Sequence, residues 1–170
     1  MASSISSFEL KAEDYSIKEA MQTAFGQGRT LVTPLQNALI AATVANDGVM
    51  MKPYVVDRIE NADKATVRSY RPQSYTKPMS ILEADYLTEL MRAVVTDGTA
   101  KELESLKIDA AGKTGSADQN GGKPAHAWFI GFAPADDPQL VVSIVVESVG
   151  TGSEYAVPIA REIFAAYFNK

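Results

Sequence analysis

The chain has 170 residues, the length of one ordinary domain or of part of a larger one. Its residues are 46% hydrophobic, which is enough for a core, and its net charge of −5 without a basic run argues against nucleic-acid binding. It has no cysteine and one histidine, which excludes thiol chemistry and zinc fingers and disfavours a histidine-based metal site. No apolar stretch approaches the roughly 18 residues of a membrane span, and the N-terminus lacks the features of a signal peptide.

The first part of the chain predicts helices. Ser16–Phe25 opens with the capping-box pattern Ser-x-x-Glu, so we expect a short helix that ends at the glycines after it. Thr33 opens a second capping box, with proline at the first helical position, and the helix that follows reaches Asn46. This second helix is apolar on most sides, which predicts that it is buried.

The middle of the chain predicts a hairpin and a longer helix. Tyr54–Glu60 and Thr66–Tyr70 are rich in β-forming residues and flank a polar turn. A third capping box begins at Ser80, and apolar residues then recur at helical spacing until Gly98. A further short helix is expected to start at Thr99.

The last part of the chain predicts three strands and a closing helix. The strands Ile108–Ala117, Ala125–Ala133 and Gln139–Ser148 have short connections, which favour an antiparallel meander. Glu154–Asn169 has an apolar stripe at helical spacing, with Pro158 tolerated near its first turn. The sequence therefore predicts an α+β fold, an antiparallel sheet of three C-terminal strands packed against helices.

The segment Ala110–Gln119, AAGKTGSADQ, is the candidate for the functional motif of the chain. Two interpretations of it do not fit the sequence. A phosphate-binding P-loop needs a glycine where Lys107 stands, and it must open a helix, whereas a polar loop and a strand follow here. A Ser-His-Asp hydrolase needs a G-x-S-x-G turn, which the chain lacks. The lone His126 stands next to Trp128 in an expected strand, so a structural role is favoured.

The third interpretation takes Lys113-Thr114-Gly115 as the K-T-G motif of serine acyltransferases. A lysine beside a cleft attracts a substrate carboxylate, and the hydroxyls of Thr114 and Ser116 share one face of a strand, where they can bind it. Gly115 between them lets a substrate approach closely, and a backbone N–H of the strand edge can stabilise an oxyanion.

Segments around this motif resemble the penicillin-binding proteins, the family of serine D,D-transpeptidases, in the same order along the chain. The resemblance is continuous from about Gly26 to the end and weaker in the first 25 residues. The segments are GQGRTLVTPLQNALIAATVANDGVMMKP, LMRAVVTDGTA, AGKTGSA, HAWFIGFAP, LVVSIVVE and AREIFAAYF.

The resemblance implies roles for individual residues. Lys113 is the lysine of the cleft, and Thr114 and Ser116 bind the carboxylate of a D-Ala-D-Ala peptide or of a β-lactam. The backbone N–H of Ser116 is one half of the oxyanion hole, and Gly115 permits close approach. No cofactor or metal is implied. Three further positions match the family and are interpreted as structural: Gln27, Trp128 and Gly131.

Two motifs of the family are missing. No S-x-N occurs, and the single S-x-x-K match, Ser74–Lys77, precedes Pro78 rather than opening a buried helix, so we expect no nucleophile in this chain. We therefore expect residues 1–25 to be an N-terminal segment and residues 26–170 to be the C-terminal half of a transpeptidase domain, with Met1 as an expression start. The isolated chain should be inactive.

The partners expected from this assignment are the missing N-terminal half, the stem peptide and β-lactams. The free edge of the last strand should also permit self-association. The expected location is the extracytoplasmic face of the bacterial membrane, with an anchor upstream. Two alternatives stay open, a non-catalytic binding module of the same fold and a β-lactamase-type hydrolase, for which no deacylating carboxylate is assigned.

Overall fold

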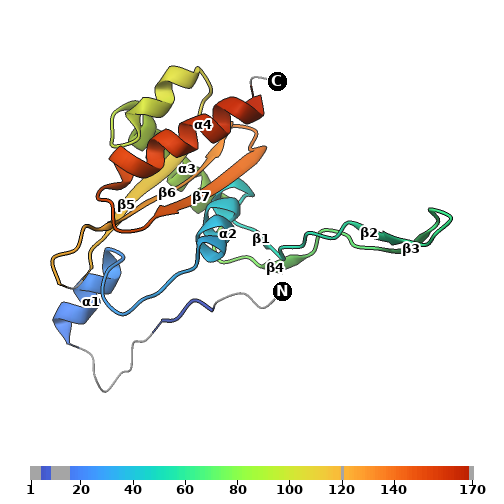
Figure 1. Cartoon of the computed structure of the whole chain (residues 1–170), viewed down its shortest axis with the longest axis horizontal. Coiled ribbons are helices and arrows are strands. Elements are labelled where there is room, and N and C mark those ends of the chain that lie inside the picture. Colours follow the sequence, from blue (N-terminus) through green and yellow to red (C-terminus); the bar gives the residue numbers. More distant parts are fainter. Residues whose placement is uncertain (1–4, 9–15, 120, 169–170) are drawn as a thin grey trace.

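The computed structural model describes residues 5–8, 16–119 and 121–168. It confirms the expected mixture of helices with antiparallel sheets (Figure 1). The helices are α1 (Ile17–Ala24), α2 (Pro34–Ala45), α3 (Ile81–Thr96) and α4 (Val157–Phe168), with a 3-10 helix η2 (Lys101–Leu106) and a π-helical turn η3 (Gly152–Ala156). The strands are β1 (Met50–Met51), β2 (Arg58–Glu60), β3 (Thr66–Ser69), β4 (Ser74–Thr76), β5 (Ala111–Ala117), β6 (His126–Ala133) and β7 (Leu140–Val146).

The main sheet is the expected antiparallel meander, in the order β5-β6-β7. Gly115 lies opposite Trp128, which in turn lies opposite Val145, and neither pairing contains a bulge. The outer edges of β5 and β7 have no neighbouring strand within the described residues. Both edges therefore carry backbone groups that are free to pair with something else.

The sheet is the middle of three layers. On one face Phe129 packs with Phe164 of α4 and Leu103 of η2, and all three are fully buried. On the other face Phe132 packs with Met91 of α3 and Val44 of α2. Alternation along β6 sends its side chains to both faces, which explains why this strand is apolar at nearly every position.

Serine caps start α1 and α3 as expected. Ser16 and Ser80 each exchange hydrogen bonds with the glutamate three residues later. At α2 only half of the expected capping box forms, because Thr33 Oγ1 accepts from the Gln36 N–H while the Thr33 N–H donates to Ser6 Oγ. A segment far away in the sequence thus replaces the local partner.

Two predicted helix starts need correction. The short helix expected at Thr99 is the 3-10 helix η2, which begins at Lys101. The last helix begins at Val157 rather than Glu154, because residues 152–156 form the π-helical turn; its expected end at Asn169 lies outside the described residues. Pro158 is the second residue of α4, within its first turn as expected.

Helix α2 is only partly buried, contrary to the prediction. Ala41, Thr43 and Val44 are buried against the sheet and α3, but Leu35 and Ile40 are 47% and 39% exposed. The described residues supply a covering layer on one side of the helix only, so part of its apolar surface stays open. None of the helices in the described part of the chain combines the length and apolarity needed to span a bilayer.

The start of β5 is held by one arginine of α3. Arg92 lies 2.9 Å from Asp109, just before β5, and also bonds to Asp136, just after β6. The Ala135 N–H donates to the Asp109 carbonyl at 2.8 Å, which joins the same two segments. These contacts anchor the buried end of the K-T-G strand to the helical layer.

The expected hairpin forms from β2 and β3 and projects away from the body of the molecule (Figure 1). At its base β1 pairs with β4, which contains Ser74. Ser74 therefore lies in an exposed strand and not at the start of a buried helix. Its position agrees with the interpretation of the S-x-x-K match as a chance occurrence.

Candidate active site

A groove of about 420 Å³ runs along β5, beside β6 and residues 25–32. Lys113 and Gly115 lie opposite Ile130 and Trp128 in the β5–β6 register, so all four residues belong to one face of the sheet. Ile130 and Trp128 are half-buried and form an apolar floor. Lys113 is exposed at its side.

The side chains of Thr114 and Ser116 share the opposite face, as their spacing predicts. Thr114 Oγ1 lies 2.6 Å from Thr99 Oγ1, and Ser116 Oγ accepts from the Gly152 N–H at 3.4 Å. Both residues still line the groove, because β5 is an edge strand and its free edge is open. The site is therefore a strand edge, with the lysine on one face and the two hydroxyls on the other.

The backbone of β5 offers hydrogen-bonding groups along this edge. The Ser116 carbonyl accepts from Gln27 Nε2 at 3.1 Å, and the Thr114 carbonyl accepts from Lys113 Nζ at 2.8 Å. Both donors are side chains outside the ladder, so these carbonyls point away from β6. The N–H and C=O of one residue in an antiparallel strand point to the same side. The Ser116 N–H therefore also points away from β6, toward the groove.

The electrostatics of the groove favour an anion. Among the described residues Lys113 forms no ion pair, and no aspartate or glutamate lines the groove. An uncompensated ammonium group above an apolar floor attracts a carboxylate. Its bond to its own strand also places this charge beside the edge that carries the Ser116 N–H.

Gln27 is a site residue that the sequence interpretation treated as structural only. It stands between Gly26 and Gly28, whose φ angles of 83° and 88° are positive and suit glycine. These two glycines turn the chain so that the Gln27 side chain reaches the edge of β5. A glutamine between two glycines was the available signal, but its target lies 89 residues away.

The sequence interpretation missed Thr99 and Gly152, which both contact the K-T-G strand. A Cβ atom on Gly152 would lie 2.3 Å from the Trp128 carbonyl oxygen and 2.6 Å from that of Gly115. The π-helical turn therefore lies directly on the β5–β6 ladder, and only glycine fits there. No local pattern marks either residue, because both contacts join segments that are separate in the sequence.

His126 has the structural role that was favoured. Its Nδ1 accepts the Ser148 N–H at 3.1 Å, which ties β6 to the segment after β7. Within the described residues that line the groove, no serine or threonine hydroxyl is bonded to a histidine or lysine side chain. An activated hydroxyl nucleophile of that kind is thus not formed by these residues.

The family model described as the penicillin binding protein transpeptidase domain matches residues 4–165. The chain belongs to this family. Peptidoglycan D,D-transpeptidase PbpA of Mycolicibacterium smegmatis is 39% identical over an alignment of 152 residues that covers 85% of this chain and 31% of that protein. PbpA of Mycobacterium tuberculosis is 36% identical over 153 residues, with the same coverage of 85% and 31%. The chain thus spans about a third of the length of the curated relatives it matches.

Solved structures agree with this assignment. Penicillin-binding protein A from M. tuberculosis, as a ceftriaxone acyl-enzyme complex, matches with a TM-score of 0.81 and 34% identity, over 86% of this chain and 35% of that one. Pseudomonas aeruginosa PBP2 in complex with WCK 5153 matches with a TM-score of 0.75 and 28% identity, over 92% of this chain and 34% of that one. The predicted family and fold class are both confirmed.

Proposed function

We propose that this chain is the C-terminal part of a peptidoglycan D,D-transpeptidase, which cross-links cell-wall peptides by serine acyl transfer and binds β-lactams. The observation that carries the proposal is the Ser116 N–H on the outer edge of β5, beside Lys113, whose ammonium group forms no ion pair with any described residue. Relatives that are named as D,D-transpeptidases, and neighbours that are acyl-enzyme complexes with β-lactams, support it.

Carboxylate binding is assigned to Lys113, Thr114 and Ser116. The lysine supplies the positive field, and Gly115 lets the substrate lie close to the strand. Ser116 Oγ accepts from the Gly152 N–H, so its own proton is available for a carboxylate oxygen. In the contact between the hydroxyls of Thr114 and Thr99 either can donate, and when Thr99 donates, the Thr114 proton is left for the substrate.

Oxyanion stabilisation is assigned to the Ser116 N–H. In the complete domain a serine outside this chain attacks the D-Ala-D-Ala carbonyl, and the carbonyl oxygen becomes negative as the tetrahedral intermediate forms. A fixed N–H aimed at that oxygen stabilises it before D-Ala leaves. The amine of a neighbouring peptide then takes the acyl group. No carboxylate among the described residues of the groove could activate a water, so transfer is preferred to β-lactamase-type hydrolysis.

The proposal includes the partner and the location. We infer that an N-terminal half of the domain, which brings the S-x-x-K and S-x-N motifs, covers the exposed apolar side chains Leu35 and Ile40. Its first strand would pair with the free edge of β7, an edge that otherwise permits self-association. Peptidoglycan lies outside the cytoplasmic membrane, so the extracytoplasmic face is the proposed site of action.

The deciding test is Lys113→Ala in the full-length protein, with the rate of acylation by fluorescent penicillin as the measurement. The rate should fall by about 10²- to 10³-fold, the loss typical of one electrostatic contact in such a site. Lys123→Ala removes an exposed positive charge outside the groove and should leave the rate within about twofold. Equal rates for wild type and Lys113→Ala would refute the assignment.

A further inference from the structure

The hairpin of β2 and β3 is an exposed arm without a core of its own. Every residue of both strands is exposed, and among them Ile59 and Val67 keep 44% and 68% of their surface open. The arm projects from the three-layered body (Figure 1). A two-stranded ribbon is marginally stable by itself in water, and its outer edges offer unpaired backbone groups. An element of this kind gains stability when another chain lies on it.

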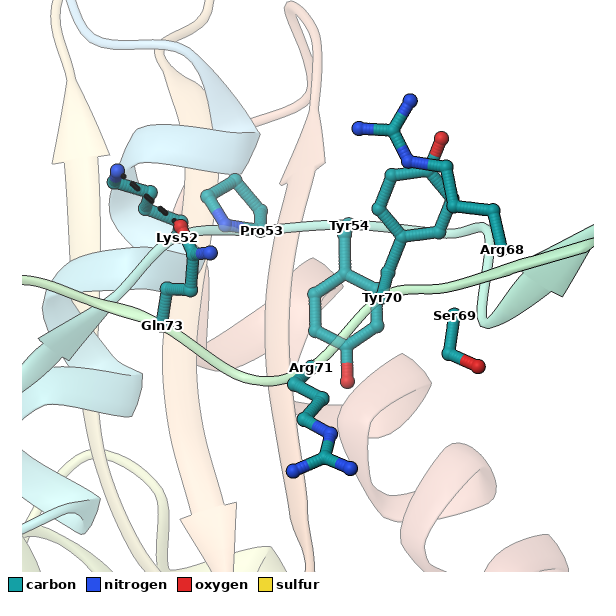
Figure 2. A pocket seen from close by; sticks show the side chains of 8 residues that line it. All are labelled: Lys52, Pro53, Tyr54, Arg68, Ser69, Tyr70, Arg71 and Gln73. Carbon is teal, nitrogen blue, oxygen red and sulfur yellow. Dashed lines mark hydrogen bonds between the residues drawn. The ribbon is translucent and has the colours of Figure 1, made fainter.

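A pocket of about 480 Å³ lies at the base of this arm. Three cationic side chains line it, from Lys52, Arg68 and Arg71, together with two tyrosines and no carboxylate (Figure 2). The Arg68 guanidinium lies 4.8 Å from the centre of the Tyr70 ring, an arrangement that holds it without an acidic partner. In Figure 2 Arg68 and Tyr70 lie at one side of the pocket, and Arg71 extends at the other.

The two arginines of this pocket differ from all others in the chain. The six arginines all lie within the described residues, and four of them form ion pairs with carboxylates. Arg68 and Arg71 form none there, and the Lys52 ammonium reaches only the side-chain oxygen of Gln73, at 3.5 Å. In a chain with a net charge of −5, unpaired cations gathered in one pocket indicate an anionic ligand.

We propose that the arm and its pocket bind an acidic segment of a partner protein in extended conformation. Carboxylates of that segment pair with Arg68, Arg71 and Lys52, and its backbone lies along an open edge of the arm. The exposed Ile59 and Val67 favour a polypeptide over a polyanion without apolar groups, because they offer contact area that only apolar side chains use. This surface is separate from the groove at β5, since the two share no lining residue.

The test uses the full-length protein and a fluorescein-labelled peptide of ten residues that alternates valine and glutamate. We expect saturable binding that weakens as salt is added, and slower hydrogen exchange of the amides in residues 54–71. The double variant R68Q/R71Q should weaken binding at least tenfold. The matched control K101Q/K123Q removes two exposed positive charges elsewhere and should change binding less than twofold.

Three outcomes would overturn the proposal. The first is that the peptide does not bind, and the second is that K101Q/K123Q loses as much binding as R68Q/R71Q. The third is that inorganic polyphosphate binds as tightly as the peptide and depends on the same arginines, which would show that the pocket recognises negative charge alone. A peptide that alternates valine and lysine should not bind. If circular dichroism shows that R68Q/R71Q disturbs the fold, Lys52→Gln replaces it, and a loss of about threefold is then the expected result.

Discussion

At the scale of single residues, the role proposed for the K-T-G strand depends on the directions of its backbone groups. Gln27 and Lys113 occupy the carbonyls of Ser116 and Thr114 from outside the ladder, which shows that the Ser116 N–H faces the groove. Gly152 packs directly on the β5–β6 ladder, on the face that carries the Thr114 and Ser116 side chains, and so limits where β5 can lie.

The residue-scale prediction concerns Gly152→Ala. The added Cβ would lie 2.3 Å from the Trp128 carbonyl oxygen, so the π-helical turn or the strand must move. Overpacking of this kind costs about 1–3 kcal/mol. We expect a loss of that size in the free energy of unfolding of the full-length protein, measured in urea, and slower acylation by fluorescent penicillin, because the Ser116 N–H shifts.

Gly115→Ala is the control for Gly152→Ala, because its added Cβ is less crowded. Its Cβ would lie 3.3 Å from the Trp128 Cβ, and among the described residues other than its two chain neighbours it would meet no backbone atom within 4 Å. We expect Gly115→Ala to lower the free energy of unfolding by less than Gly152→Ala does. Equal stability of Gly152→Ala and the wild type would show that the π-helical turn does not support the strand.

At the scale of elements, the serine caps fix where helices begin, and the cap of α3 depends on charge. The Ser80 N–H and hydroxyl both donate to Glu83 Oε2 at 2.7 Å, and this lowers the pKa of the Glu83 carboxyl below its usual 4.5. A carboxyl with a lowered pKa stabilises the folded state above its unfolded pKa and loses that contribution as the pH falls through the folded pKa. The cap of α3 should therefore weaken in acid.

The element-scale prediction compares Glu83→Gln with wild type across pH. At pH 7 the wild type should have the higher midpoint of thermal unfolding, because only it carries the charged cap. Below pH 4.5 the difference should shrink as Glu83 becomes protonated. Glu104→Gln, which neutralises an exposed carboxylate without an ion pair in the described residues, should show no such convergence. A constant gap between Glu83→Gln and the wild type at every pH would rule out the charged cap.

At the scale of the whole molecule, the described residues cover one face of the sheet completely and the other face only in part. The sheet face toward α4 is sealed by fully buried aromatic residues such as Phe129 and Phe164. On the opposite face Trp128 is half-buried in the groove, and Leu35 and Ile40 of α2 stay partly exposed. In the complete domain that we propose, the N-terminal half covers this apolar surface.

The whole-molecule prediction concerns the isolated 170-residue chain. We expect no change in its intact mass after incubation with penicillin, because no activated nucleophile is formed at the described groove. The full-length protein should gain one penicillin mass per chain under the same conditions. A stoichiometric adduct on the isolated chain would contradict this expectation, and peptide mapping should then look first at Ser74, in strand β4.

Sequence alone identified the K-T-G strand, the meander that carries it and the serine-capped helices, because capping, strand alternation and turn chemistry involve neighbours in the chain. Short-range patterns could not give the α2 cap completed by Ser6 or the π-helical turn before α4. Only the tertiary structure showed which way the Ser116 N–H points, through a contact from Gln27, 89 residues away. The physical reason is that such contacts depend on how whole layers pack, and no local spacing records that.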